Sequence, residues 1–183
     1  PEQAGLAAFT AAALTRGTAR RTFAQIYEEL ESVGASAGIS AGTYSTGFAG
    51  KSLAEDLPLV LDILSDALRH PTFPPDEIEK LRGEILTDLE ERVHDTARMA
   101  ALTFHELAYP AGHPYARSLS GYVETVSRIA RDDVAAFYRG GYGPAGMIVV
   151  VVGAVKTDEA LAQVEAAFGD WAGSTYERAP LPD

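Results

Sequence analysis

The sequence has no cysteine, few basic residues and no long apolar run. Without thiols it cannot form a disulfide framework, a thiolate zinc site or a cysteine nucleophile. The 15 Lys and Arg residues are outnumbered by 26 Asp and Glu, and the net charge of −11 argues against a nucleic-acid partner, because phosphate binding requires clustered cations. The longest apolar run, residues 147–152, is far shorter than the about 18–20 residues that span a bilayer. We therefore expect a soluble protein with no membrane insertion, in an undetermined compartment.

What is present is typical of a globular protein: 46% of the 183 residues are hydrophobic and 22% are charged. Residues 35–52 are small and β-prone and predict two weak strands folded near Gly42 and Thr43. Residues 147–152 show no alternation and predict a strand buried on both faces. Apolar periodicity, capping residues and prolines predict helices over residues 6–14, 23–33, 57–68, 75–93, 97–108, 123–129, 132–138 and 158–168, with a loose tail after them.

This order predicts a mixed α/β domain with fewer strands than its sheet requires. A central strand buried on both faces needs a partner on each side, and only three strands are predicted. We therefore expect sheet strands to be missing from residues 1–183 and the parent protein to continue beyond at least one end.

Few residues form a recognisable chemical constellation. The sequence has no G-x-S-x-G elbow and no glycine-rich phosphate loop. His105-Glu106 begins the zinc motif H-E-x-x-H, but Tyr109 occupies its closing position. His113 is interpreted as part of the loop architecture. The chain alone is therefore not expected to be a working enzyme.

Four carboxylates share one face of the long predicted helix, at spacings of four, three and four residues. Such a face can perform acid–base chemistry if it is buried, but an acidic stripe is more often a solvated surface. The stripe is Glu84, Asp88, Glu91 and Asp95.

Several short stretches, in this order and spacing, together resemble the pitrilysin/insulinase family of zinc peptidases. The resemblance spans nearly the whole chain. It rests on Gly5-Leu6-Ala7, Gly17-Thr18, residues 26–36, Pro71-Thr72-Phe73-Pro74, Glu77-Ile78-Glu79, His113-Pro114-Tyr115, Gly121, residues 132–138, residues 149–153 and Phe168-Gly169-Asp170-Trp171.

The resemblance places the zinc motif of the family's active members on the first helix. These members carry H-x-x-E-H, in which two histidines bind zinc and the glutamate is the general base. Those places fall on Ala8, Ala11 and Ala12, and the third ligand falls on or beside Asp88. The resemblance therefore implies that this chain holds neither a metal nor a catalytic group.

The implied fold is α+β, an antiparallel-rich mixed sheet covered by helices, with the family's first strands missing. Residues 1–183 would form one incomplete domain, with the first half and its degenerate zinc helix in 1–130 and the start of the second half in 131–183. The implied function is that of a non-catalytic domain. It would pair with a catalytic H-x-x-E-H domain or subunit, which holds the zinc, and enclose peptide substrates with it.

Two alternatives remain open. The chain could be a purely structural subunit of a larger complex, with no peptide binding. It could also be an enzyme with an unrecognised site at His105 and Glu106, supported by the acidic face of the long helix.

Overall fold

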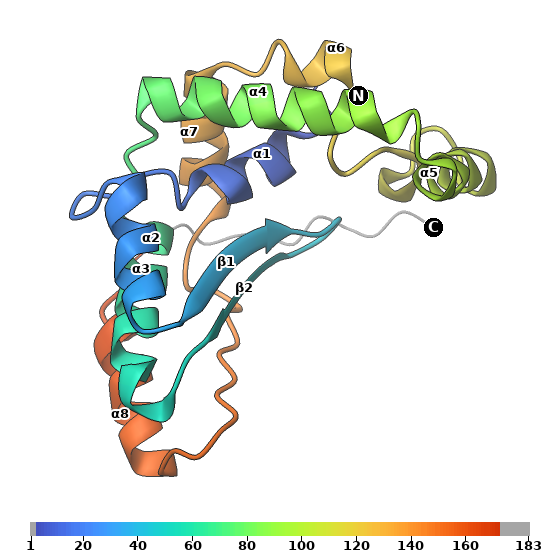
Figure 1. The fold of residues 1–183 in the computed structure, drawn as a ribbon. Helices are drawn as coiled ribbons and strands as arrows, with labels where there is room; N and C mark the ends of the chain where they lie inside the picture. Colours follow the sequence, from blue (N-terminus) through green and yellow to red (C-terminus); the bar gives the residue numbers. More distant parts are fainter. Residues whose placement is uncertain (1–2, 173–183) are drawn as a thin grey trace.

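The structure, a computed structural model, describes residues 3–172 (Figure 1). The tail expected at the end of the chain lies, from residue 173 on, outside the described residues. The elements are α1 (Leu6–Ala13), α2 (Phe23–Ser32), β1 (Ser36–Ala41), β2 (Thr46–Lys51), α3 (Leu57–Arg69), α4 (Pro75–Arg92), α5 (Thr96–Ala108), α6 (Val123–Val126), α7 (Arg131–Gly141) and α8 (Thr157–Phe168), with short 3-10 turns η1 (Ala54–Asp56) and η2 (Pro114–Ala116).

Local signals in the sequence account for the ends of several helices. Thr22 and Gln25 form a reciprocal capping box at the start of α2, in which each side chain accepts a hydrogen bond from the other residue's backbone N–H. Gly34 follows the helix with φ of 63°, which a residue without a side chain adopts at little cost. The long helix α4 begins at Pro75, where a missing N–H leaves no helical hydrogen bond unmade.

The glycine-rich segment forms the predicted hairpin. Strands β1 and β2 pair antiparallel from Ser36 opposite Lys51 to Ala41 opposite Thr46. Both strands pack on α3, and β1 also packs on α1. An antiparallel sheet with helices around it confirms the α+β class, although the described residues are mostly helical.

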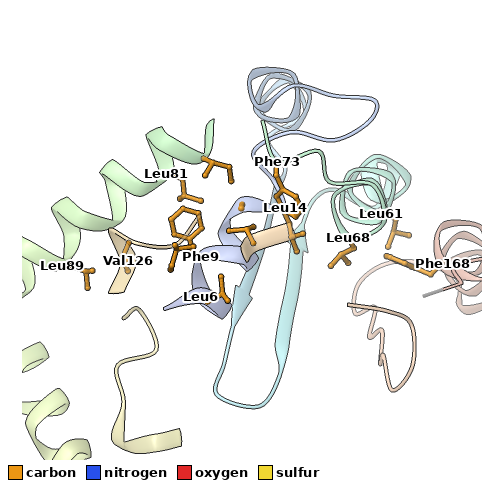
Figure 2. Close-up of a cluster of buried hydrophobic side chains, with 14 residues drawn as sticks. Leu6, Phe9, Leu14, Leu61, Leu68, Phe73, Leu81, Leu89, Val126 and Phe168 are labelled. Carbon is orange, nitrogen blue, oxygen red and sulfur yellow. The ribbon is translucent and has the colours of Figure 1, made fainter. Parts of the chain in front are cut away.

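The main core lies where the first helix meets the rest of the chain. Phe9 of α1 and Leu14, directly after it, are buried with Leu81 and Leu89 of α4 and with Val126 at the end of α6 (Figure 2). The same cluster continues to α3 and α8. The burial of these apolar groups is the main force that fixes α1 in the centre of the fold.

A second core cluster lies between α2 and α3. It consists of Ile26, Leu30, Val60, Ile63 and Leu64, all buried. The side chain of Val60 also leaves no room for a side chain at Gly50 of β2, since a Cβ atom there would lie 2.3 Å from Val60 Cγ1. The hairpin therefore lies directly against α3.

The predicted strand Met147–Val152 is wrong for the described chain. The segment is extended but belongs to no sheet, and Ile148, Val150 and Val152 are 81%, 75% and 92% exposed. Met147 and Val149 pack against the main core. The apolar run thus has one covered face and one open face, because no neighbouring strand in the described chain pairs with it.

Among residues 3–172, no helix is both long and apolar enough to cross a membrane.

Candidate functional site

Helix α1 presents three alanines where the sequence analysis placed the zinc motif. Ala11 is 1% exposed, and Ala8 and Ala12 are half-buried. The helix packs against β1, α4 and α7. A methyl group offers no lone pair to a metal and no proton to a substrate, so these positions contribute packing only.

Asp88 of α4 is engaged by an arginine of the next helix. The Arg98 guanidinium donates to both of its carboxylate oxygens, at 2.7 and 3.1 Å, and this hydrogen bonding raises the pKa of Arg98. The Asp88 side chain is 53% exposed. It is therefore part of a solvated ion pair.

The remaining carboxylates of the acidic stripe also have structural partners or lie in solvent. Arg16 pairs with Glu84, and its hydrogen bonds lower the pKa of that carboxyl. Asp95 lies beyond the end of α4 and caps α5, accepting from the N–H groups of Ala97 and Arg98. Its place on the α4 stripe was therefore wrong, because the helix ends at Arg92. No group of three possible metal ligands occurs within residues 3–172.

The histidines near the end of α5 form an aromatic cluster. Tyr109 stacks on His105, with ring centroids 5.8 Å apart, and on His113, at 5.0 Å. His113 Nδ1 accepts from the N–H of Tyr115, so it caps the short turn that follows, as its interpretation as a loop residue predicted. Glu106 accepts from the hydroxyl of Tyr122. The cluster brings the two histidines to one tyrosine and leaves Glu106 on a different partner.

A buried carboxylate that the sequence analysis missed fixes the loop after α1. Asp66 of α3 is 1% exposed and accepts a hydrogen bond from the Thr18 hydroxyl. Arg20 and Arg21 approach its two oxygens to 3.2 and 3.5 Å. Two sequence features could have indicated this network. Asp62 and Asp66 lie four residues apart on a mainly apolar helix, and Arg20 and Arg21 are adjacent basic residues in a chain with few of them.

The neighbouring Asp62 completes this network. It accepts from Arg20 at 2.8 Å and from Arg21 at 2.7 Å. Burial raises the pKa of the Asp62 carboxyl, but the hydrogen bonds and charges of the two arginines outweigh burial and hold it below its ordinary value. The network ties the end of α1 to α3 through charge-assisted hydrogen bonds.

Two glycines fix the other end of α1. Gly5 and Gly121 have φ of 94° and 81°, and their backbones cross closely. A Cβ atom at Gly5 would lie 2.9 Å from Ser120 O, and one at Gly121 would lie 2.6 Å from Ala4 O. Only residues without side chains permit this approach.

A small cavity of about 240 Å³ opens beside the start of α1. Its lining comes from residues 3–7, the hairpin loop at Gly42 and Thr43, Pro114, residues 117–119 and Phe137. Pockets that hold a drug-sized ligand have volumes of roughly 300–1,000 Å³. The cavity is therefore smaller than a pocket for a drug-sized ligand and has room for about one side chain.

Comparison with solved structures places the fold among bacterial peptidase-like proteins. The chain aligns with a protease from Helicobacter pylori over 100% of its length and 44% of that chain, at a TM-score of 0.83 and 18% identity. It aligns with the peptidase M16 inactive domain from Pseudomonas fluorescens over 98% of its length and 44% of that chain, at a TM-score of 0.80 and 22% identity. At this identity the likeness concerns the fold.

Curated sequences are similar over most of the chain. A probable mitochondrial-processing peptidase subunit beta of Arabidopsis thaliana is 28% identical over 91% of this chain and 31% of its own length. Cytochrome b-c1 complex subunit 1 of Rattus norvegicus is 27% identical over 91% of this chain and 34% of its own length. The chain thus spans about a third of these relatives.

Two family models divide the chain between them. The model described as Insulinase (Peptidase family M16) matches residues 1–121, and the model described as Peptidase M16 inactive domain matches residues 128–183. The first match covers the elements from α1 to η2, and the second covers α7 and α8. The chain therefore belongs to the insulinase family of peptidases, as the short stretches of its sequence indicated.

Proposed function

We propose that this chain is the non-catalytic domain of a zinc-dependent peptidase. It pairs with a catalytic H-x-x-E-H domain or subunit, and the two enclose peptide substrates. The observation that carries the proposal is the chemistry of α1, which has Ala8, Ala11 and Ala12 where the family resemblance expects two imidazoles and a carboxylate.

These residues do not fit a zinc ion. The three methyl groups cannot coordinate a metal, and the carboxylate of Asp88 is held by Arg98. No catalytic step is therefore assigned to this chain, and zinc and the general base belong to the partner in this proposal.

The small cavity beside α1 supports a role in enclosing peptide. Its volume of about 240 Å³ is sufficient for one side chain of a bound peptide. A partner domain facing α1 would supply the opposite wall and remove the peptide from water. Phe137, which is 38% exposed and lines the cavity, is the apolar contact for that side chain.

Helix α5 supports pairing. None of its residues is buried, and Phe104 and Leu107 are 65% and 82% exposed. Large apolar side chains gathered on one exposed element mark interaction surfaces. The two curated relatives are named as subunits, which agrees with a partner-bound role.

The first experiment measures zinc stoichiometry by elemental analysis and cleavage of a quenched fluorescent peptide on the same purified sample. The expected result is near-zero zinc and no cleavage by the chain alone, and chelator-sensitive cleavage after addition of an H-x-x-E-H partner domain. One tightly held zinc per chain with chelator-sensitive cleavage would contradict the proposal.

The pairing surface is tested separately with charged substitutions on α5. Phe104→Glu with Leu107→Glu is expected to weaken association with the partner domain by at least about tenfold, because charges replace apolar contacts. Thr103→Glu is the matched control, since it adds a charge at an exposed polar position of the same helix. Equal affinity of the double variant and the control would exclude α5 as the pairing surface.

A second candidate is a purely structural subunit, favoured by the similarity to cytochrome b-c1 complex subunit 1. It predicts tight partner binding with no affinity for peptide, so a titration with labelled peptide separates the two candidates. An enzyme site at His105 and Glu106 predicts instead that His105→Ala abolishes some activity of the chain alone.

A further inference from the structure

The cavity beside the start of α1 lies apart from the open edges of the sheet. Loops and helices line it, and none of its lining residues belongs to β1, to β2 or to the segment 147–152. The hairpin contributes only its loop, at Gly42 and Thr43. A strand added along the edge of the hairpin would therefore extend the sheet and would not fill this cavity.

Contacts between the loops hold the walls of the cavity in place. The rings of Tyr44 and Tyr115 pack edge to face, with centroids 5.6 Å apart, and join the hairpin loop to the turn η2. The Arg92 guanidinium at the end of α4 donates to Ser118 Oγ at 2.9 Å and to Gly121 O at 3.3 Å. The crossing of the two glycines joins the same loop to α1. The cavity is therefore preformed, which lowers the entropic cost of binding.

Arg117 is the only ionisable residue among the described residues that line the cavity. Its Nη2 group donates to Gly112 O at 3.1 Å, and it forms no ion pair with a carboxylate of residues 3–172. Its Nε and Nη1 groups therefore have no partner in the described chain. The guanidinium keeps its positive charge and its remaining N–H donors for a ligand.

Two neighbouring groups add further hydrogen-bond donors. Because Arg92 donates to Ser118 Oγ, the hydroxyl hydrogen of Ser118 is left to donate to another acceptor. Helix α1 has no side-chain cap, and the N–H group of Ala7 in its first turn has no partner within the helix. These donors agree with the charge of Arg117 in favouring an anionic ligand.

The apolar part of the lining defines the rest of the ligand. Leu119 and Phe137 have exposed side chains beside the cavity, and Leu6 contributes a buried one. A glutamate side chain combines a short methylene stem, which fits this apolar surface, with a carboxylate that accepts hydrogen bonds from a guanidinium. The volume of about 240 Å³ has room for about one such side chain.

We propose that the cavity binds a glutamate side chain of the enclosed peptide and that Arg117 determines the preference for it. The guanidinium pairs with the carboxylate, and the hydroxyl of Ser118 donates to the same group. The inference rests on the proposed function, because it names the substrate side chain that the cavity takes.

The first test titrates the isotope-labelled chain with the peptide acetyl-Ala-Glu-Ala-amide and follows its amide signals by NMR. Saturable shifts are expected at residues 3–7, 42–43 and 117–119. The peptide acetyl-Ala-Gln-Ala-amide should bind at least about tenfold more weakly, because it lacks the charge. The net charge of −11 would by itself favour the neutral peptide, so a preference for glutamate reports the cavity. Equal binding, or stronger binding of the glutamine peptide, would overturn the proposal.

Two arginine variants locate the preference. Arg117→Gln is expected to abolish it. Arg128→Gln is the matched control, since it removes the same charge from an exposed arginine outside the cavity lining, and it should keep the preference. Thermal unfolding confirms that both variants fold, and the comparison of the two peptides on the wild type decides if Arg117→Gln does not. An unchanged preference in Arg117→Gln, or its loss in both variants, contradicts the proposal.

Two further titrations examine other occupants. Acetyl-Ala-Ala-Ala carries a free C-terminal carboxylate, and stronger binding of this peptide than of the glutamate peptide would contradict the assignment to a side chain. The titration is also made on the full-length protein, because residues before Gln3 would lie beside the cavity. Binding by the chain and none by the full-length protein would show that the protein's own residues fill the cavity, and would overturn the proposal.

Cleavage by the assembled peptidase separates this inference from the proposed function. The chain and an H-x-x-E-H partner domain receive quenched peptides in which glutamate replaces glutamine at each position in turn. At one position, glutamate should lower KM at least about fivefold with little change in kcat, and Arg117→Gln should remove this difference. Cleavage with the same KM at every position would overturn the inference and leave the proposed function standing. A glutamate preference of the chain alone without any cleavage by the assembly would contradict the proposed function instead.

Discussion

The hairpin and the segment Met147–Val152 contrast sharply. The hairpin is rich in glycine and has few large apolar residues, yet it forms a paired sheet with a defined register. The segment is the most apolar run of the chain, yet it joins no sheet within the described residues. The difference shows that backbone partners, more than side-chain hydrophobicity, decide whether an extended run becomes a strand.

The hairpin also has a support that the segment lacks. It lies on α3, whose position is fixed from α1 through Asp66 and the arginines of the intervening loop. The segment connects α7 to α8, and its outer face is open. The predictions below separate the effect of this support from the effect of pairing.

The largest expected effect comes from removing the carboxylate of Asp66, which is buried in α3, the helix on which the hairpin packs. Asp66→Ala should lower the free energy of unfolding by about 3 kcal/mol, because it removes the buried acceptor of the Thr18 hydroxyl and one of the two aspartates that face Arg20 and Arg21. Urea denaturation followed by circular dichroism measures the change. Asp62→Ala, at a carboxylate that is 40% exposed, is the control and should cost less. Equal losses would show that burial of Asp66 is not what matters.

A smaller loss is expected from crowding the hairpin against α3. Gly50→Val should destabilise the protein by about 1–3 kcal/mol, because its side chain would overlap Val60. Gly38→Val in the paired strand has no heavy atom within 4 Å of the new Cβ and serves as the control. Calorimetric melting temperatures compare the two variants. Equal melting temperatures would mean that the hairpin does not pack on α3 as described.

A third test concerns Tyr138, which ties α7 to the end of α3 ahead of the unpaired segment. Its hydroxyl donates to the carbonyl oxygens of Leu68 and Arg69, and burial raises its pKa to about 12. Tyr138→Phe should cost about 1 kcal/mol at neutral pH.

The pH dependence of that loss has a defined sign. The folded state favours the neutral phenol, so its contribution is complete below the ordinary pKa of 10.0 and is lost as pH rises through about 12. The difference in unfolding free energy between wild type and Tyr138→Phe should therefore shrink between pH 10 and 12. A difference that stays constant over this range would contradict the assigned hydrogen bonds.

The smallest effect is expected in the segment itself. Val150→Ser should change the free energy of unfolding by less than about 0.5 kcal/mol, because the side chain is 75% exposed and its backbone is unpaired. Val60→Ala, at a buried position of α3, is the contrasting variant and should cost about 1–3 kcal/mol. A large loss for Val150→Ser would show that the segment is paired in solution.

Capping residues, prolines and apolar periodicity predicted the positions of the longer helices and of the hairpin, because these signals act locally. Thr22 and Pro75 mark helix starts wherever the helices pack. The error at Met147–Val152 arose because apolar composition does not specify whether a neighbouring strand is present. The buried role of Asp66 was missed because it depends on arginines 45 and 46 residues earlier in the chain. The division at residue 130 and the assignment of the zinc positions to Ala8, Ala11 and Ala12 stay predictions.

The crossing of Gly5 and Gly121 limits how far this chain can diverge in sequence. Both positions require glycine because two backbone segments are in contact there, and this requirement does not depend on metal binding. Substitutions of the residues on α1 would therefore leave the requirement for both glycines unchanged. Backbone packing of this kind preserves sequence similarity between a domain without catalytic residues and its catalytic relatives.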